Sequence, residues 1–156
     1  MLIFMLILRL NRVDMKLKLG FLLASIILVF SLSCGKGSDH QSIPEVPVDL
    51  YLDISSTIYI KLSNVGGYEY LSGGYKGLIV YRVSMEEFVA YDRTCPYHPY
   101  DECALIEMDP SGIILKDTCC GSQFNILDGS VSKGPAEYPL KKYQTIFDGQ
   151  ILQISN

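Results

Sequence analysis

The stretch from Asp117 to Leu140, DTCCGSQFNILDGSVSKGPAEYPL, constrains the fold of this chain more than any other segment. It combines two adjacent cysteines with a Gly-Ser pair, an Asp-Gly pair and a Gly-Pro-Ala corner. Each glycine or proline favours a turn, so the few apolar residues between the turns are held in place. The pattern therefore predicts a rigid loop that surrounds something small.

A second cysteine-bearing stretch lies upstream, from Ala90 to Cys103, with the sequence AYDRTCPYHPYDEC. It contains Cys95 and the only histidine of the predicted folded part, His98. Two cysteine-bearing loops that face each other can bind a metal ion or be cross-linked by disulfides. The residues alone leave both arrangements open.

The beginning of the chain has the composition of a targeting segment. Met15 to Lys18 is basic, Leu19 to Leu32 is apolar over a length typical of secretory signals, and Ser31-Leu-Ser-Cys34 has small residues before a cysteine. We interpret Met15 as the start of the protein. Residues 1–14 are then an upstream extension that belongs to no domain.

The end of this segment resembles the lipobox of bacterial lipoproteins, in which the cysteine becomes the lipidated first residue of the mature protein. The match is partial, because Ser31 and Ser33 occupy positions where a lipobox usually has Leu and Gly or Ala. The resemblance implies a signal peptide over residues 15–34 with lipid attachment at Cys34. We then expect an exported protein that is anchored to the periplasmic or surface side of a bacterial membrane. Ordinary signal cleavage that leaves Cys34 as a free thiol is the alternative.

The chain that follows Cys34 is acidic. The whole sequence has 13 basic and 17 acidic residues, and four of the basic and one of the acidic residues precede Cys34. The remaining nine basic and 16 acidic residues give a net charge of −7. Binding to nucleic acid or to anionic lipid through charge is therefore disfavoured, whereas a protein partner is compatible with this charge.

The rest of the chain divides into a linker and one domain. Residues 35–47, GKGSDHQSIPEVP, are polar and interrupted by proline, so they are predicted to form a flexible linker. In residues 48–156, short β-branched and aromatic segments alternate with glycine and proline turns, and no window of helical length has a clear 3.6-residue period. This pattern predicts an all-β, antiparallel sandwich or barrel. The expected strands are 49–54, 57–62, 68–71, 78–83, 88–91, 103–108, 113–116, 144–147 and 150–154.

The part from Leu78 to Leu140 resembles a Rieske domain, the all-β electron-transfer module that holds a [2Fe–2S] cluster between two loops. In that family a C-x-H loop is followed by C-x-x-H-G-S-x-F, a glycine turn, G-P-A and P-L. This chain has the G-S-x-F segment and the three features after it, in order. They are Gly121-Ser122-Gln123-Phe124, Asp128-Gly129, Gly134-Pro135-Ala136 and Pro139-Leu140. The resemblance implies a Rieske-type antiparallel β-sandwich with two cysteine-bearing loops.

The metal-ligand positions depart from this family. In an alignment on the Gly-Ser pair, Asp117 takes the place of the second-loop cysteine and Cys120 takes the place of the histidine. Cys95 matches the first ligand, and His98 follows it with two residues between rather than one. A Rieske centre has two histidines on one iron, so one histidine cannot complete the standard ligand set.

Cys119 matches a cysteine that forms a disulfide to the first loop in some members of the family, and here the resemblance implies a bond to Cys103. Under one interpretation, Cys95 and Cys120 bind iron or zinc together with His98 and either Asp117 or a remaining cysteine. The domain is then an electron-transfer module with an atypical cluster or metal site.

Under a second interpretation, the bonds Cys95–Cys120 and Cys103–Cys119 cross-link the loops, and the domain is a cluster-free binding or assembly module without a cofactor. The third interpretation, a vicinal redox pair of Cys119 and Cys120, requires a distorted backbone.

The chain has no Ser-His-Asp grouping, no phosphate-binding glycine loop and no paired carboxylates in a recognisable frame. We therefore expect an electron-transfer or binding component rather than a stand-alone enzyme. Its expected partners are the membrane, through the lipid on Cys34, and a redox or other protein partner.

Overall fold

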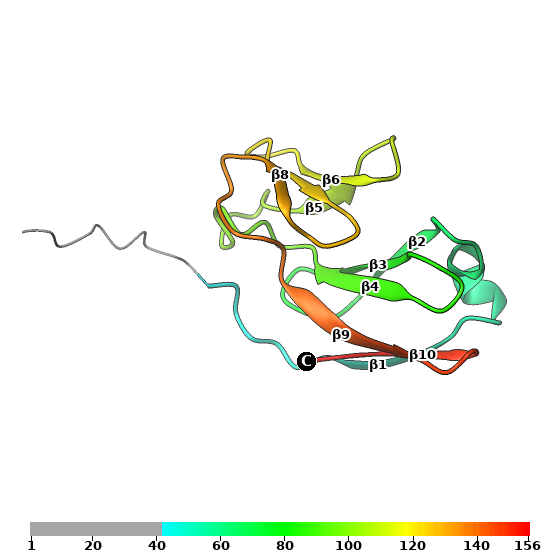
Figure 1. Cartoon of the computed structure of the whole chain (residues 1–156). Coiled ribbons are helices and arrows are strands. Elements are labelled where there is room, and N and C mark those ends of the chain that lie inside the picture. Colours follow the sequence, from blue (N-terminus) through cyan, green and yellow to red (C-terminus); the bar gives the residue numbers. More distant parts are fainter. Residues whose placement is uncertain (1–41) are drawn as a thin grey trace, which may run out of the picture. The chain divides into compact units, whose positions relative to one another are not determined.

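The computed structural model describes residues 42–156, which lie in one compact unit (Gln41–Asn156). The predicted signal peptide, Cys34 and the first part of the predicted linker lie outside the described residues. The elements are β1 (Asp49–Asp53), η1 (Thr57–Ser63), β2 (Tyr68–Leu71), β3 (Leu78–Arg82), β4 (Phe88–Asp92), β5 (Ile106–Met108), β6 (Ile114–Asp117), β7 (Gln123–Asn125), β8 (Val131–Lys133), β9 (Lys142–Phe147) and β10 (Ile151–Ser155) (Figure 1). Within residues 42–156, no helix has the length and apolar character needed to cross a membrane.

Six strands form one antiparallel sheet in the order β1-β10-β9-β4-β3-β2. The β9–β10 hairpin turns at Gly149, whose φ of +104° favours glycine. Side chains from strands that are distant in this order, including Leu52 of β1, Leu152 of β10 and Val80 of β3, share one buried core. The sheet therefore curls on itself, as Figure 1 shows.

The strands β5, β6, β7 and β8 form a second antiparallel sheet. Its apolar side chains, among them Leu115 and Phe124, share a core with one face of the β3–β4 hairpin. Alternate residues of this hairpin belong to different cores, so Val80 lies in the core of the curled sheet and Ile79 and Tyr91 lie in the other. Because both faces are covered, every residue of β3 and β4 is buried.

The predicted all-β, antiparallel architecture with two cysteine-bearing loops is confirmed. The segment 57–62 is an exception, because it lies in the 3-10 helix η1 rather than in a strand. The Ser56 side chain accepts a hydrogen bond from Ile58 N and caps the start of this helix. Ile58 and Ile60 are exposed while Leu62 is buried, so the β-branched residues that suggested a strand have no sheet face to pack on.

The described part of the predicted flexible linker, 42–47, is held against the domain. Lys141 donates to Pro44 O at 3.2 Å and forms an ion pair of 3.0 Å with Glu45. Tyr100 OH donates to Ser42 O at 3.4 Å. Composition could not reveal these contacts, because 96 residues separate Glu45 from Lys141 in the sequence.

Candidate metal centre

Two loops meet where β4 and β6 end. The first, residues 93–105, joins β4 to β5, and the second, residues 118–122, joins β6 to β7. A disulfide between Cys103 and Cys119 links the loops, with Cα atoms 5.5 Å apart. This is the disulfide that the Rieske resemblance implied, and both of its cysteines are exposed.

The other two cysteines of the domain, Cys95 and Cys120, are free thiols. Cys95 is fully buried in the core under the second sheet, and Cys120 is half-buried beside it. Their sulfur atoms lie 3.6 Å apart, whereas a disulfide requires about 2.05 Å. The second disulfide of the cluster-free interpretation is therefore not formed in this structure, although its two sulfurs are neighbours.

Asp117, the last residue of β6, completes a group of three candidate metal ligands. Its side chain is buried, with 1% of the residue exposed. The backbone N–H of Cys119 donates to Oδ1 at 2.7 Å, and Cys120 Sγ lies 3.1 Å from Oδ2. One ligand atom from each of Cys95, Asp117 and Cys120 lies within 4.8 Å of the others. The structure thus brings together three of the four predicted metal ligands.

The turn after Cys120 fixes the position of its sulfur. Gly121 has a φ of +80°, which other residues rarely adopt. Ser122 Oγ lies 3.0 Å from Cys120 Sγ and accepts a hydrogen bond from Ala136 N at 2.9 Å. The Gly-Pro-Ala corner is thereby tied to the second loop, and the hydroxyl between them holds the thiol in place.

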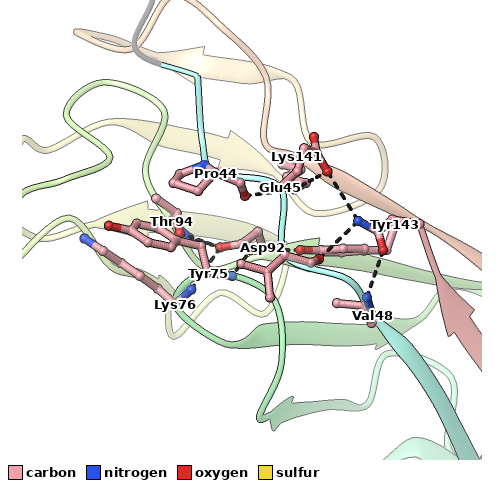
Figure 2. Close-up of polar contacts among 11 residues, drawn as sticks. Pro44, Glu45, Val48, Tyr75, Lys76, Asp92, Thr94, Lys141 and Tyr143 are labelled. Atoms are coloured by element: carbon pink, nitrogen blue, oxygen red, sulfur yellow. Dashed lines mark hydrogen bonds and ion pairs between the residues drawn. The ribbon is translucent and has the colours of Figure 1, made fainter.

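The first loop is supported by a buried aspartate, Asp92, at the end of β4 (Figure 2). Its carboxylate accepts hydrogen bonds from Tyr75 N at 2.7 Å, Thr94 N at 2.9 Å and Tyr143 OH at 2.9 Å. The approach at Gly74 requires glycine, because φ is +61° and an added Cβ would lie 2.4 Å from Asp92 Oδ2. This network joins residues 74–76, β4 and β9 at the start of the first loop, which carries Cys95.

Burial raises the pKa of the Cys95 thiol above its ordinary value, and the hydrogen bond to Asp117 adds to the rise. A hydrogen bond from the backbone of Tyr97 acts in the opposite direction. The thiol therefore keeps its proton at neutral pH unless a cation displaces it. Metal binding at this position would release protons and would be favoured by rising pH.

His98, the fourth predicted ligand, lies apart from this group on the exposed surface of the first loop. Its ring contacts the ring of Tyr97, with centroids 4.1 Å apart. Asp101 contacts His98 through the backbone, because Asp101 N donates a hydrogen bond to His98 O at 3.1 Å. His98 is therefore a solvent-exposed loop residue that lies outside the group of candidate ligands.

The geometry of the two thiols suits a single metal ion. In a tetrahedral site with metal–sulfur bonds of about 2.3 Å, two thiolate sulfurs lie about 3.8 Å apart. The Cys95 and Cys120 sulfurs, 3.6 Å apart, are already close to that separation. Asp117 offers a third, oxygen ligand on the same side. A fourth ligand, such as water, would complete a tetrahedral site.

The same donor set does not fit the [2Fe–2S] cluster that the Rieske resemblance implies. That cluster needs two cysteines on one iron and two histidines on the other. Within residues 42–156 the grouped donors are two thiols and one carboxylate, and no imidazole belongs to the group. In addition, Cys95 and Cys120, which align with ligands of different irons, have their sulfurs 3.6 Å apart.

No family model and no curated protein matches this chain, whereas several solved structures do. The ferredoxin of carbazole 1,9a-dioxygenase from Nocardioides aromaticivorans IC177 aligns with 14% identity over 70% of this chain and 97% of its own, with a TM-score of 0.47. A Sphingomonas yanoikuyae B1 ferredoxin aligns with 21% identity over 70% and 99%, with a TM-score of 0.46. A chain from the complex of reduced oxygenase and oxidized ferredoxin in carbazole 1,9a-dioxygenase aligns with 22% identity over 67% and 92%, also with a TM-score of 0.46. At these TM-scores the likenesses assign neither family nor activity.

Proposed function

We propose that this chain is an exported, lipid-anchored domain of Rieske type that binds one thiolate-preferring metal ion, iron or zinc, through Cys95, Cys120 and Asp117. The observation that carries the proposal is the 3.6 Å separation of the two thiol sulfurs, with a buried carboxylate beside them. Thiolates with one harder donor suit both metals. The lipid anchor at Cys34 rests on the sequence pattern of residues 15–34.

The proposal separates the frame of the site from its ligands. The Gly121-Ser122 turn and the Gly-Pro-Ala corner hold the second loop by the Ser122 hydroxyl, as a site that must position a sulfur atom requires. The residues at the ligand positions differ from those of the Rieske pattern, so the frame supports one ion rather than a two-iron cluster. With iron the domain is a one-electron carrier for a redox partner, and with zinc the ion is structural.

The first test is metal and thiol analysis of the full chain, purified without reductant from a bacterial host that exports it. We expect one metal ion per chain and two thiols, Cys95 and Cys120, that react with a thiol reagent only after chelation in denaturant. Two irons with acid-labile sulfide would overturn the single-ion site. Zinc alone would remove the electron-transfer role and leave the metal-binding role.

Matched variants assign the ligands. Cys95→Ser and Cys120→Ser should each lose the metal, because each removes one of two thiolates from a site with three protein ligands. His98→Ala should keep it, because the imidazole lies outside the ligand group. If His98→Ala loses the metal and Asp117→Asn retains it, the ligand assignment proposed for this site is wrong.

A second candidate function is the cluster-free binding module with two disulfides. The observation in its favour is the same sulfur pair, because neighbouring thiols in an oxidising compartment can form a disulfide with a small side-chain movement. Absence of both metal and free thiols in the exported protein would select this candidate. The domain would then act through its surface rather than through a metal.

A further inference from the structure

The polypeptide enters the domain beside the first cysteine-bearing loop. Tyr100 of that loop donates a hydrogen bond to Ser42 O, and Lys141 holds Pro44 and Glu45 through a hydrogen bond and an ion pair. Ser42, the first described residue, therefore lies beside the first cysteine-bearing loop. The close-up in Figure 2 shows this entry segment beside the Asp92 network that supports the loop.

The entry segment and the cysteine-bearing loops lie at one end of the curled sheet. Strands alternate in direction along the order β1-β10-β9-β4, so β1 begins at the end where β4 finishes and the first loop starts. The helix η1 follows β1 and lies at the opposite end, as Figure 1 shows. Ser42 is eight positions after Cys34, so an extended chain between them spans at most about 28 Å. A lipid on Cys34 would therefore keep the loop end of the domain near the membrane.

Tyr100 contacts Ser42 at this entry point, Tyr75 packs against Tyr100, and Tyr97 lies in the same loop as Tyr100. We call these three exposed tyrosines the tyrosine face. Tyr100 is 55% exposed, Tyr97 is 41% exposed and Tyr75 is 36% exposed. The rings of Tyr75 and Tyr100 meet edge to face with centroids 6.2 Å apart. Tyrosine is favoured at the membrane–water interface, because its ring enters the apolar boundary while its hydroxyl stays hydrated.

Charges beside the tyrosine face select the kind of lipid. Asp101 and Glu102 are exposed in the same loop and would be repelled by anionic headgroups. The neighbouring Lys76 ammonium is held by hydrogen bonds to the carbonyl oxygens of Asp101 and Ala104. It is therefore not free to bind an anionic headgroup and compensate for the two acidic side chains. A zwitterionic headgroup region accepts the tyrosines without this repulsion.

From these contacts we infer that the tyrosine face docks on the zwitterionic lipid surface of the membrane to which Cys34 anchors the chain. This inference rests on the lipid anchor of the proposed function and adds an orientation to it. The half-buried thiol of Cys120 belongs to the loop joined to this end by the Cys103–Cys119 disulfide. A partner that reaches the metal centre then approaches along the membrane surface rather than from the bulk solvent.

Tryptophan quenching tests the orientation, since the chain contains no tryptophan of its own. The full lipidated chain carrying Tyr97→Trp is reconstituted in vesicles of phosphatidylcholine with bromine on its acyl chains. The matched control is Ile58→Trp in η1, a position that is 75% exposed at the opposite end. Docking predicts quenching of the Tyr97→Trp protein at least about twofold stronger than that of the control, because only the former residue reaches the lipid boundary.

The failures of the anchor and of the docking give different results. If the chain does not float with vesicles, the lipid anchor is absent and the docking inference is overturned as well. If the anchor is present, Cys34→Ser should abolish flotation. If the chain floats but the two tryptophans are quenched equally, the anchor stands and the docking is overturned. Vesicles with a large share of phosphatidylglycerol should reduce quenching at Tyr97→Trp, and increased quenching there would contradict the choice of a zwitterionic surface.

Discussion

Two buried aspartates end two strands of this domain, and each directly precedes a cysteine-bearing loop. Asp92 ends β4, and its carboxylate accepts hydrogen bonds from five donor groups. Asp117 ends β6 and receives one backbone N–H, from Cys119, while Cys120 Sγ contacts its other oxygen. The donors to Asp92 are the backbone N–H groups of Tyr75, Lys76 and Thr94 and the hydroxyls of Thr94 and Tyr143.

The difference between the two carboxylates separates a structural role from a chemical one. A carboxylate has about four lone-pair directions, and the donors around Asp92 occupy all of them. Asp117 keeps capacity on the side that faces two thiols. We therefore expect substitutions at Asp92 to change the free energy of unfolding and substitutions at Asp117 to change metal binding.

The largest effect is expected from Asp92→Asn. The amide nitrogen would face donors such as Tyr75 N or Thr94 N and leave them without an acceptor, which should lower the free energy of unfolding by about 3 to 4 kcal/mol. Urea denaturation of the metal-free protein measures this loss. Asp117→Asn is the matched control and should cost less than about 1 kcal/mol, since the remaining oxygen can still accept from Cys119 N. Equal losses at the two positions would remove the distinction between them.

Removal of the Cys103–Cys119 disulfide should have the next largest effect. The bond joins residues 16 apart, and the double variant Cys103→Ser with Cys119→Ser should lower the free energy of unfolding by about 3 kcal/mol. Metal content should remain unchanged in the folded protein, because the thiols of Cys95 and Cys120 are untouched. Loss of metal from a folded double variant would show that the disulfide belongs to the ligand set.

Asp117→Asn should weaken metal binding by about 100-fold or more, because it removes the only oxygen ligand of the group. Competition with a chelator at fixed pH measures the change. The double-serine disulfide variant serves as the comparison, because its stability is reduced while its ligands are complete. An unchanged metal affinity in Asp117→Asn would leave the two aspartates with the same structural role.

The smallest expected effect concerns Tyr143, one of the donors to Asp92. Burial raises the pKa of its phenol, and the Asp92 carboxylate adds to the rise. A raised pKa in the folded state means that the stabilising contribution is complete below the unfolded value of about 10 and is lost as pH rises above it. Tyr143→Phe should cost about 1 kcal/mol at pH 7 and should make the decline of stability above pH 10 shallower.

Tyr91→Phe is the matched control for that experiment. Within the described residues the buried Tyr91 hydroxyl has no hydrogen-bond partner, and burial also raises its pKa. Its removal leaves no donor or acceptor unpaired, so stability at pH 7 should stay within about 0.5 kcal/mol of the original protein. A loss as large as that of Tyr143→Phe would mean that the Asp92 network contributes nothing specific.

Local patterns predicted those parts of the fold whose residues carry their own signal. The expected strands 78–83, 88–91, 144–147 and 150–154 correspond to β3, β4, β9 and β10. The prediction of a strand at 57–62 was wrong, because β-branched residues indicate a strand only where they can pack on a sheet face. Ile58 and Ile60 are exposed to solvent instead.

The sequence could predict which residues are candidate ligands, but it could not predict how they are arranged in space. Cys95, Cys120 and Asp117 could be named from their positions in the cysteine-bearing loops, but the exposed position of His98 depends on its packing against Tyr97. The Asp92 network was missed, although an aspartate directly after a fully apolar strand is a signal that its charge must be met by donors. Those donors come from residues 75, 76, 94 and 143, which are too far apart in the sequence for a local pattern to connect them.

The hairpin of β3 and β4 is one wall shared by two cores, with Val80 on one side and Ile79 on the other. Loss of either core would expose one full face of the same pair of strands to water. The two sheets should therefore unfold in a single cooperative transition, and amide hydrogens of β3 and β4 should exchange with solvent only through global unfolding. The second sheet should not open by itself at low free-energy cost, so a reagent reaches Cys95 only when the whole domain unfolds. The stability of the whole domain therefore protects the buried thiol.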